Sequence, residues 1–288
     1  MVPASRLAGL ESELLRWRRE GIINGDFFDG NLSGFVFSPP EDLPGTKSIV
    51  VVAIPDYPVH FWFDFRGERK RVIIPPHYLH CGRKDRAVGV ALSAILGPSG
   101  FRAVRARLPV KLLAVSCGLA LYGRNNITYI DGLGSFHRLV SFFTDLECSG
   151  HEWREPVAME SCTSCTACSR SCPSGAIDPG RFLLRAERCI TLWNEMSGDV
   201  PFPDWLEPSW HNCLVGCMRC QEVCPANRMS AGRFVEGASF SEDETDMLLG
   251  GTPREEMPDS LMQRLEAWDL LESLEMLPRN LAPLLVSR

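Results

Sequence analysis

Apolar and polar residues recur along this chain in patterns that predict helices in some stretches and strands in others. Close to the N-terminus, apolar side chains return at helical spacing with charged residues between them, at Leu7, Leu10, Leu14 and Trp17. This spacing predicts an amphipathic helix that buries one face. Residues 48–54 instead form a continuous run of mostly β-branched residues between Gly45 and Pro55, which predicts a buried strand.

The same criteria predict several more elements before residue 155. Helices are expected at 86–96, from Val110 to about Gly118 and at 135–146, and strands at 102–109 and 126–130. Strands mixed with helices indicate a layered α/β domain. An aromatic cluster, which predicts either an apolar pocket or part of a core, is formed by Phe61, Trp62, Phe63 and Phe65.

The last part of the chain, residues 233–288, is predicted to be helical. Ser241-x-x-Glu244 has the spacing of a capping box, and Thr252-Pro253-x-Glu255 places proline at a first helical position. Further on, apolar residues return at helical spacing, at Leu261, Leu265, Trp268, Leu271 and Leu274. We expect this stripe to pack in a core.

Cysteine spacing in the middle of the chain predicts two iron–sulfur clusters. The first run, C-x2-C-x2-C-x3-C-P, has the spacing of a bacterial [4Fe–4S] site and consists of Cys162, Cys165, Cys168 and Cys172. The second run lacks the leading cysteine and consists of Cys217, Cys220 and Cys224. Because the last cysteine of such a run ligates the other cluster in two-cluster ferredoxins, we expect crossed ligation and single-electron transfer.

Crossed ligation assigns seven of the eight ligands. The first cluster is predicted to use Cys162, Cys165, Cys168 and the remote Cys224. The second is predicted to use Cys172, Cys217, Cys220 and one further cysteine. Cys189 and Cys213 both remain as the source of that ligand, and spacing alone does not decide between them.

Zinc and disulfide bonds are the alternative explanations for this many cysteines. Structural zinc sites usually pair two C-x2-C motifs, which the first run fits poorly. Disulfides suit short secreted chains, whereas this chain has 288 residues and neither a recognisable signal peptide nor an apolar run of about 20 residues. Because cluster thiolates need a reducing compartment, the sequence predicts a cytoplasmic protein without a membrane partner.

The segment from Ser161 to Arg228 resembles the double-cluster domain of epoxyqueuosine reductases and reductive dehalogenases. The matching words are the first cysteine run with its Pro-Ser-Gly-Ala-Ile ending, then Arg188-Cys189-Ile190, and then the stretch from Gly216 to Pro225. In these relatives the isolated cysteine after the first run is a ligand. The resemblance therefore implies Cys189 as the eighth ligand and leaves Cys213 as a buried or spare thiol.

The resemblance also implies a nitroreductase-like N-terminal domain that holds a cobalamin against the clusters. A glycine-rich segment within residues 116–147 is similar to the relatives' corrin site, where glycines let the backbone approach a flat macrocycle. The residues implied to bind cobalamin are Gly118, Gly123, Asn125, Gly134 and Ser135. Tight turns between elements would explain the same glycines.

One departure from these relatives bears on the catalytic chemistry. Epoxyqueuosine reductases have a proposed proton-donating aspartate shortly before the glycine-rich segment, but this chain has no Asp or Glu between Asp85 and Asp131. Tyr78 is the catalytic candidate instead, because the Pro-led turn at residues 75–80 carries a tyrosine and two histidines able to donate or relay protons. Tyr122 and His137 are weaker candidates, and a structural role is the alternative for each.

Together these observations predict an α+β protein in three parts. Residues 1–155 are expected to form a nitroreductase-like layered α/β domain, 156–232 a ferredoxin-like two-[4Fe–4S] domain, and 233–288 a helical segment. With 45% hydrophobic and 23% charged residues, the composition is that of an ordinary globular protein. The net charge of −6 gives no overall field that attracts RNA, so a nucleic-acid partner is not expected.

Two functions fit this organisation. In the first, a ferredoxin or flavodoxin feeds the clusters, which pass low-potential electrons to a bound cobalamin for reduction of a small substrate. In the second, the chain is an electron-transfer protein that reduces a partner, for example a corrinoid protein, and has no substrate of its own. The missing carboxylate favours the second function, and the size of the N-terminal part favours the first.

Overall fold

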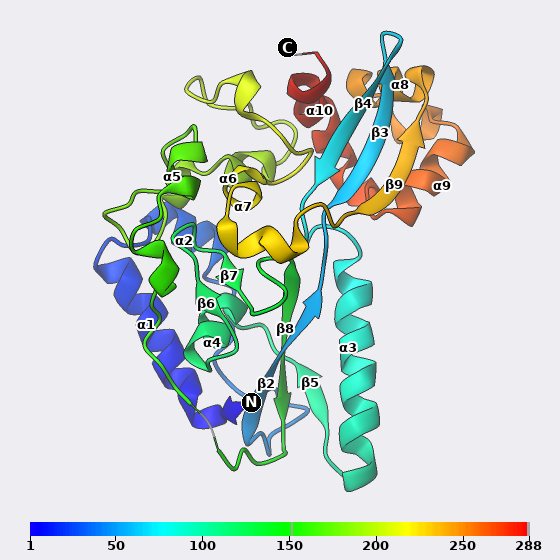
Figure 1. The fold of residues 1–288 in the computed structure, drawn as a ribbon. Coiled ribbons are helices and arrows are strands. Elements are labelled where there is room, and N and C mark those ends of the chain that lie inside the picture. Colours follow the sequence, from blue (N-terminus) through cyan, green and yellow to red (C-terminus); the bar gives the residue numbers. More distant parts are fainter. Residues whose placement is uncertain (151, 287–288) are drawn as a thin grey trace.

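The computed structural model describes residues 1–150 and 152–286 and is built on two sheets, with the cysteine-bearing loops beside both (Figure 1). The helices and strands, in chain order, are β1 (Val2–Pro3), α1 (Leu7–Arg19), α2 (Gly25–Asn31), β2 (Ser48–Pro55), β3 (Val59–Phe65), β4 (Glu68–Ile74), α3 (Cys81–Leu96), β5 (Ala103–Arg105), α4 (Val110–Ser116), β6 (Leu121–Tyr122), β7 (Thr128–Tyr129), β8 (His137–Thr144), α5 (Ala167–Ser171), α6 (Ile190–Asn194), α7 (Arg219–Glu222), the 3₁₀ helix η6 (Pro225–Ser230), β9 (Val235–Phe240), α8 (Glu242–Gly250), α9 (Asp259–Ala267) and α10 (Leu277–Leu285). Both sheets mix distant parts of the chain, so neighbouring elements are not always neighbours in sequence.

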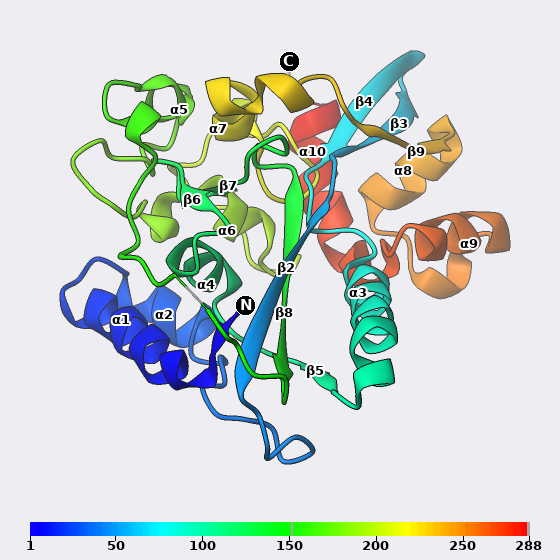
Figure 2. The same ribbon diagram turned by 60° about the horizontal axis from the view of Figure 1, so that its bottom comes forward.

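The first sheet is antiparallel and has the strand order β1-β2-β8-β5. Helices α1, α2 and α4 lie on one side of it and α3 lies on the other (Figures 1 and 2). Leu10 of α1 shares a core with Phe143 of β8, and Val88 of α3 packs with Val140 on the opposite face. The predicted layered α/β arrangement is therefore present around this sheet, which we call the first lobe.

Strand β8 corrects one expectation. Residues 135–146 were expected to be helical, but His137–Thr144 pair with the whole of β2, from Pro55↔His137 to Ser48↔Thr144. Both faces of β8 are covered by helices, so the strand is buried on both sides and lacks the alternation of apolar and polar residues that would have identified it. The strand expected at 102–109 is shorter, since only Ala103–Arg105 pair with β8.

The second sheet has the order β4-β3-β9 and carries α8, α9 and α10 (Figure 1). Strands β3 and β4 form an antiparallel hairpin that turns at Arg66 and Gly67, both with positive φ, and β9 pairs parallel to β3. Phe61, Phe63 and Phe65 are buried in the core of this second lobe. The three phenylalanines of the aromatic cluster are thus core rather than pocket, whereas Trp62 is partly exposed and donates to Glu236 at 3.0 Å. The C-terminal segment supplies a strand as well as helices.

Of the two helix starts predicted in the C-terminal segment, the structure contains one as expected. The capping box of α8 is confirmed, because Glu244 N donates to Ser241 Oγ and Ser241 N donates to Glu244 Oε2 at 3.0 Å. The start expected near Pro253 gives only a single 3₁₀ turn at Arg254–Glu256, and α9 begins at Asp259. In the part of the chain that the structure describes, no helix is both long and apolar enough to cross a bilayer.

Candidate iron–sulfur centres and the adjoining cavity

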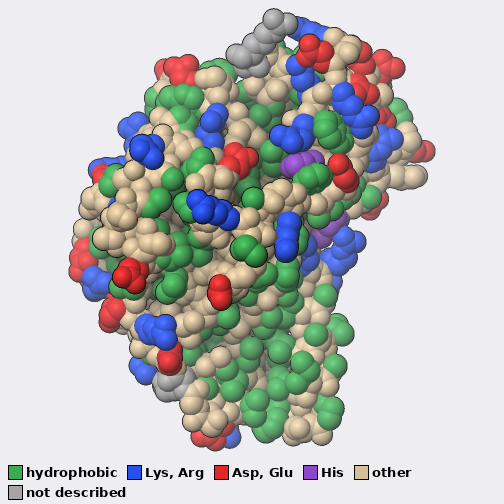
Figure 3. All heavy atoms as spheres, viewed as in Figure 1, with side chains coloured by type: hydrophobic (Ala, Val, Ile, Leu, Met, Phe, Trp, Pro, Cys, Tyr) green, Lys and Arg blue, Asp and Glu red, His purple; other side chains and the backbone are tan. Residues whose placement is uncertain are grey.

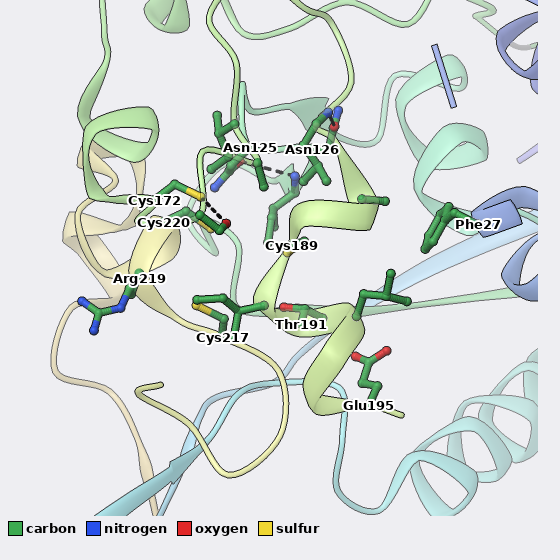
Figure 4. A pocket seen from close by; sticks show the side chains of 18 of the residues that line it. Phe27, Asn125, Asn126, Cys172, Cys189, Thr191, Glu195, Cys217, Arg219 and Cys220 are labelled. Atoms are coloured by element: carbon green, nitrogen blue, oxygen red, sulfur yellow. Dashed lines mark hydrogen bonds between the residues drawn. The ribbon is translucent and has the colours of Figure 1, made fainter. Parts of the chain in front are cut away.

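A cavity of about 340 Å³ lies where the first lobe meets the cysteine-bearing loops. Four cysteines from three separate segments line it, namely Cys172, Cys189, Cys217 and Cys220 (Figure 4). These are the four thiols that the sequence, with the resemblance, assigned to the second cluster. Four thiolates around one small space are the donor set that a [4Fe–4S] cluster requires, so the residues present fit that group.

Cys213 is placed differently from Cys189, its competitor for the eighth position. Its side chain is completely buried and packs with Phe136 and Met218 in a small apolar cluster. Burial, followed by the nearby thiol of Cys217, raises the pKa of Cys213 well above its ordinary value. Cys189 is therefore the one of the two that faces the cavity.

The other predicted group of thiols also comes together. Burial raises the pKa of Cys168, and the neighbouring thiols of Cys162, Cys224 and Cys165 raise it further. Cys224 therefore leaves the second run and lies with the first, as crossed ligation requires. All twelve cysteines are free, which excludes the disulfide alternative, and among residues 1–150 and 152–286 no three His, Cys, Asp or Glu side chains are grouped to hold a single metal ion.

Arg124, in the turn between β6 and β7, holds the loop of the first run. Its guanidinium donates hydrogen bonds to four backbone carbonyls of this region, at 3.2 Å to Cys165 O, at 2.8 Å to Pro179 O, at 3.4 Å to Thr163 O and also to Cys162 O. The positively charged guanidinium of Arg124 thus contacts the loop that is expected to bind an anionic cluster. Sequence reasoning missed this role because the partners are backbone atoms, which leave no mark in the sequence.

The next residues of the same turn reach both groups of cysteines. Asn125 Nδ2 donates to the hydroxyl of Tyr129 at 3.0 Å. The Tyr129 hydroxyl hydrogen-bonds Cys224, and the Asn125 amide hydrogen-bonds Cys220. A Cβ at Gly123 would lie 2.5 Å from Asn125 Oδ1, so glycine is required for this turn to close. A hydrogen-bonded chain from the first lobe therefore connects one thiol of each group.

This arrangement changes the interpretation of the glycine-rich segment. Of the five residues that the resemblance assigned to cobalamin, only Asn125 lines the cavity. Ser135 is buried, donates to Gln221 Oε1 at 2.9 Å and accepts from Asn227 Nδ2 at 2.9 Å, which also crowds Gly134. Elsewhere, Gly118 faces Glu152 and Arg154, while Gly123 packs on Tyr129. The five residues do not form one surface, and they do not fit a corrinoid.

Tyr78 lies in a turn whose backbone is held by two carboxylates. The amide of His77 donates to Asp56 Oδ2 at 3.1 Å, and the amide of His80 donates to Asp269 Oδ2 at 2.7 Å. Both histidines adopt left-handed backbone conformations, with φ of 82° and 58°. Such strain persists only where the surroundings impose it, and it is frequent at functional sites. The turn fixes Tyr78 between them.

Tyr78 meets a carboxyl that sequence reasoning missed. Its hydroxyl donates to Glu195 Oε1, and Glu195, which directly follows α6, lines the cavity together with Lys111 of α4 (Figure 4). Burial raises the pKa of Glu195 and lowers that of Lys111. A Cβ at Gly216 would lie 2.6 Å from the Tyr78 hydroxyl, so glycine beside Cys217 makes room for the tyrosine.

The C-terminal helix α10 fixes the segment that carries Glu195. Asn280 Nδ2 donates to Asn194 O at 2.9 Å and to Leu214 O at 2.8 Å. Beside it, Arg279 donates to four carbonyls of the same segment, those of Trp193, Met196, Ser197 and Val200. The end of the chain therefore positions one wall of the cavity.

A second cavity, of about 280 Å³, adjoins the first. It is lined mainly by apolar side chains of α1, α2 and residues 108–112. The residues that line both cavities are Phe27, Lys111, Asn126, Leu184 and Ala186. The thiols, Glu195 and Lys111 therefore lie next to an apolar space.

The two remaining catalytic candidates have other surroundings. His137 is buried, with Nε2 3.0 Å from Thr128 Oγ1 and Nδ1 3.1 Å from Gly134 O. Both ring nitrogens thus have structural partners. Tyr122 is buried in the wall of the second cavity, away from the thiols.

Known proteins resemble this chain at the cysteine-bearing loops and in the overall fold. Residues 161–227 match the family model of a 4Fe-4S double cluster binding domain. An epoxyqueuosine reductase of Pseudomonas aeruginosa is 37% identical over 146 residues, which cover 48% of this chain and 38% of that protein. The enzyme of that name from Francisella cf. novicida is 28% identical over 205 residues, or 66% and 56% of the two chains. The chain spans about half the length of the curated relatives that it matches.

Solved structures agree on the fold. The epoxyqueuosine reductase of Streptococcus thermophilus superposes with a TM-score of 0.66 at 19% identity, over 99% of this chain and 75% of that one. An epoxyqueuosine reductase solved with a modified tRNA-Tyr stem loop gives 0.57 at 20% identity, over 97% and 81%.

The fold and the matched segment define an iron–sulfur protein with a double [4Fe–4S] domain. It is related to the epoxyqueuosine reductases, so that resemblance is confirmed. The mixed α/β fold is confirmed too, while the nitroreductase-like character of the first lobe stays a prediction.

Proposed function

We propose that this protein is an oxidoreductase in which two [4Fe–4S] clusters pass low-potential electrons, one at a time, to a small substrate bound beside the second cluster. The observation that carries the proposal is the shared cavity. Four thiols, a carboxyl and a lysine line the same space, and an apolar cavity adjoins it. A site for electrons, a site for protons and room for an organic molecule are therefore adjacent.

The ligands follow the crossed pattern. Cys162, Cys165, Cys168 and Cys224 would hold the first cluster, and Cys172, Cys189, Cys217 and Cys220 the second. When bound, the clusters supply single-electron transfer at a potential set by their surroundings. This chain's own contribution to that setting includes the hydrogen bonds of Asn125 and Tyr129 to ligand sulfurs.

Tyr78 and Glu195 form the proton-delivering pair. A carboxyl with a raised pKa keeps its proton closer to neutral pH, where it can serve as a general acid. The hydrogen bond from the Tyr78 hydroxyl orients that carboxyl, and the carboxyl can return a proton to a Tyr78 phenolate. Lys111 supplies positive charge at the same wall when protonated, which favours a substrate that becomes anionic on reduction.

The cobalamin-dependent form of this function rests on the resemblance alone. Four of the five residues that it assigned to the corrin face other parts of the protein. We therefore route no step through a corrinoid.

The rival function is an electron-transfer protein that reduces a partner such as a corrinoid protein. Its main argument from sequence is the missing carboxylate between Asp85 and Asp131. Glu195 supplies a carboxyl from a later segment, at the same cavity as the thiols, and that argument no longer holds. The enzyme function is accordingly the better supported of the two.

Anoxic single-turnover experiments test the proposal. Protein loaded with about eight irons and reduced with dithionite is mixed with small electrophiles, including epoxides and organohalides, and cluster reoxidation is followed by absorbance. We expect one compound class to reoxidise the clusters, and Tyr78→Phe and Glu195→Gln to slow that step without loss of iron. Colourless protein containing zinc would refute the clusters. Reoxidation by a corrinoid protein and by no small compound would establish the rival function.

A further inference from the structure

The face that carries Cys224 has a groove of its own, of about 450 Å³. It is formed by residues 221–234, including η6, and by the neighbouring parts of β3 and β4. In Figure 1, η6 crosses the front of the molecule, and Figure 3 shows Lys and Arg side chains gathered with apolar ones on this face. The groove is separate from the cavity that holds Glu195, since Cys224 lines only the groove and Cys189 lines only the cavity.

Charge in the groove opposes that of the whole chain. Its lining includes Arg71, Arg228 and Arg233 but a single carboxylate, Glu222. The guanidinium groups of Arg71 and Arg228 have no hydrogen bond or ion pair with any residue that the structure describes, and Arg233 donates to the Tyr57 hydroxyl at 3.0 Å. Because the chain carries a net charge of −6, this local excess of cations marks a surface for an anionic partner.

Apolar side chains are exposed at the same place. Phe234, which is 43% exposed, and Val223, which is 41% exposed, line the groove. Met229, which is 76% exposed, directly follows the lining residue Arg228. Phe234 stacks on His60 with ring centroids 4.0 Å apart, so it is held in place while one face remains open. Methionine, aromatic residues and arginine are enriched at protein–protein interfaces, whereas a nucleic-acid site would be built mainly of cationic and polar groups.

Cys224 connects this surface to the redox centres. It lines the groove, and it is also the thiol that joins the first run. A donor seated here would lie next to the ligands of the first cluster, while the four thiols assigned to the second cluster line the separate cavity.

We propose that this groove docks a small acidic electron-donor protein, which delivers single electrons to the first cluster. The proposal rests on the proposed function, because it needs redox-active clusters. In each encounter the donor's centre is oxidised by one electron and the first cluster is reduced by one, and no bond is made or broken. The electron then moves to the second cluster, which frees the first for the next encounter. Weak, small and charge-steered interfaces are typical of such redox pairs.

The test follows cluster reduction rather than turnover. Oxidised, cluster-loaded protein is mixed anoxically with a photoreduced acidic plant-type [2Fe–2S] ferredoxin, and absorbance bleaching is recorded at rising KCl concentrations. We expect the bimolecular rate of the unaltered protein to fall steeply with salt. The variant Arg71→Glu/Arg228→Glu should react about tenfold or more slowly at low salt and approach the unaltered rate at high salt. Arg19→Glu, which makes the same change of charge as one of these two substitutions but on the exposed end of α1, should have little effect.

Each outcome has a defined meaning. A salt-independent rate in the unaltered protein overturns the docking proposal without any variant, and so does a double variant that reacts as fast as the unaltered protein. Dithionite, which needs no docking, should reduce all variants equally. Clusters that dithionite cannot reduce would refute the proposed function itself. Tight binding of a tRNA stem loop that the double variant loses would assign the groove to nucleic acid and overturn the protein partner.

Discussion

The two groups of cysteines have opposite surroundings. Cys224, from the first group, opens onto an arginine-lined groove at the surface. Cys189, from the second, faces an internal cavity beside Glu195 and Lys111. The repeated ligand run therefore produces two centres that are not equivalent. In the proposed function, the first centre would receive electrons from a donor protein. The second would pass them to an organic substrate bound beside Glu195 and Lys111.

The β6–β7 turn of the first lobe acts on both centres, and by different means. Arg124 holds the backbone of the first loop through carbonyl oxygens. Asn125 and Tyr129 contact the sulfurs themselves, one in each group. Arg124 therefore positions a ligand loop, whereas Asn125 and Tyr129 affect the electron density on the ligand sulfurs. These are two independent ways to tune an iron–sulfur centre.

The largest expected effect comes from removing a ligand of the internal centre. Cys189→Ser should cost about four of eight irons per chain, because a cubane loses one of its four thiolates. Cys213→Ser should keep all of them, since its thiol is packed among apolar side chains. Iron and acid-labile sulfide analysis of anoxically prepared protein checks both. The reverse result would move the second centre to Cys213 and remove the contrast between the two surroundings.

A smaller effect is expected at the carboxyl of the cavity. Burial raises the pKa of Glu195 above its ordinary 4.5, so the folded state binds this proton more tightly than the unfolded state. Its stabilising contribution is therefore full below pH 4.5 and is lost as the pH rises through the folded-state pKa. Glu195→Gln should gain in melting temperature relative to the unaltered protein between pH 5 and pH 8, by a small amount because Glu195 is accessible to solvent, which screens its charge.

Anoxic thermal unfolding followed by circular dichroism measures this difference. Glu207→Gln, which alters an exposed carboxyl, is the matched control and should run parallel to the unaltered protein at every pH. If Glu195→Gln also runs parallel, the carboxyl titrates normally and the cavity lacks the general acid that distinguishes it from the groove.

The smallest expected effect is on the potential of the first centre. Tyr129→Phe removes a hydroxyl that hydrogen-bonds Cys224, and the midpoint potential should fall because that bond favours the more negative, reduced cluster. Tyr122→Phe removes a buried hydroxyl for which the structure gives no bond to any described cysteine, and it should leave the potential unchanged. Redox titration monitored by electron paramagnetic resonance distinguishes them. Equal potentials in both variants would show that the turn only positions the loops.

Short sequence patterns correctly predicted the features of the fold that depend only on residues close together in the chain. The spacing of the first cysteine run and the Ser241–Glu244 box are short-range arrangements, and both have the expected neighbours in the structure. Strand β8 was misread because a strand buried on both faces has no polar alternation to reveal it. The resemblance, rather than spacing, pointed to Cys189.

The rest of the site depends on packing that no single segment contains. Glu195 becomes a candidate acid only because the turn carrying Tyr78 approaches α6 from more than a hundred residues away, next to Gly216. The glycine-rich segment has the composition of a ligand loop, yet its polar side chains find partners at residues 220–227. The hydrogen-bond partners of the polar side chains in this segment are therefore set by tertiary contacts, which the local sequence does not reveal.

The parallel pairing of β3 with β9 sets an order of events during synthesis. Trp62 and Glu236, which bond across this pair, are separated by 174 positions, and all eight ligand cysteines lie between them. A growing polypeptide therefore leaves the ribosome with every ligand thiol exposed before the last strand arrives, and the hairpin edge stays open until then. We expect metal delivery to have its widest access in that interval, before β9 closes the second sheet.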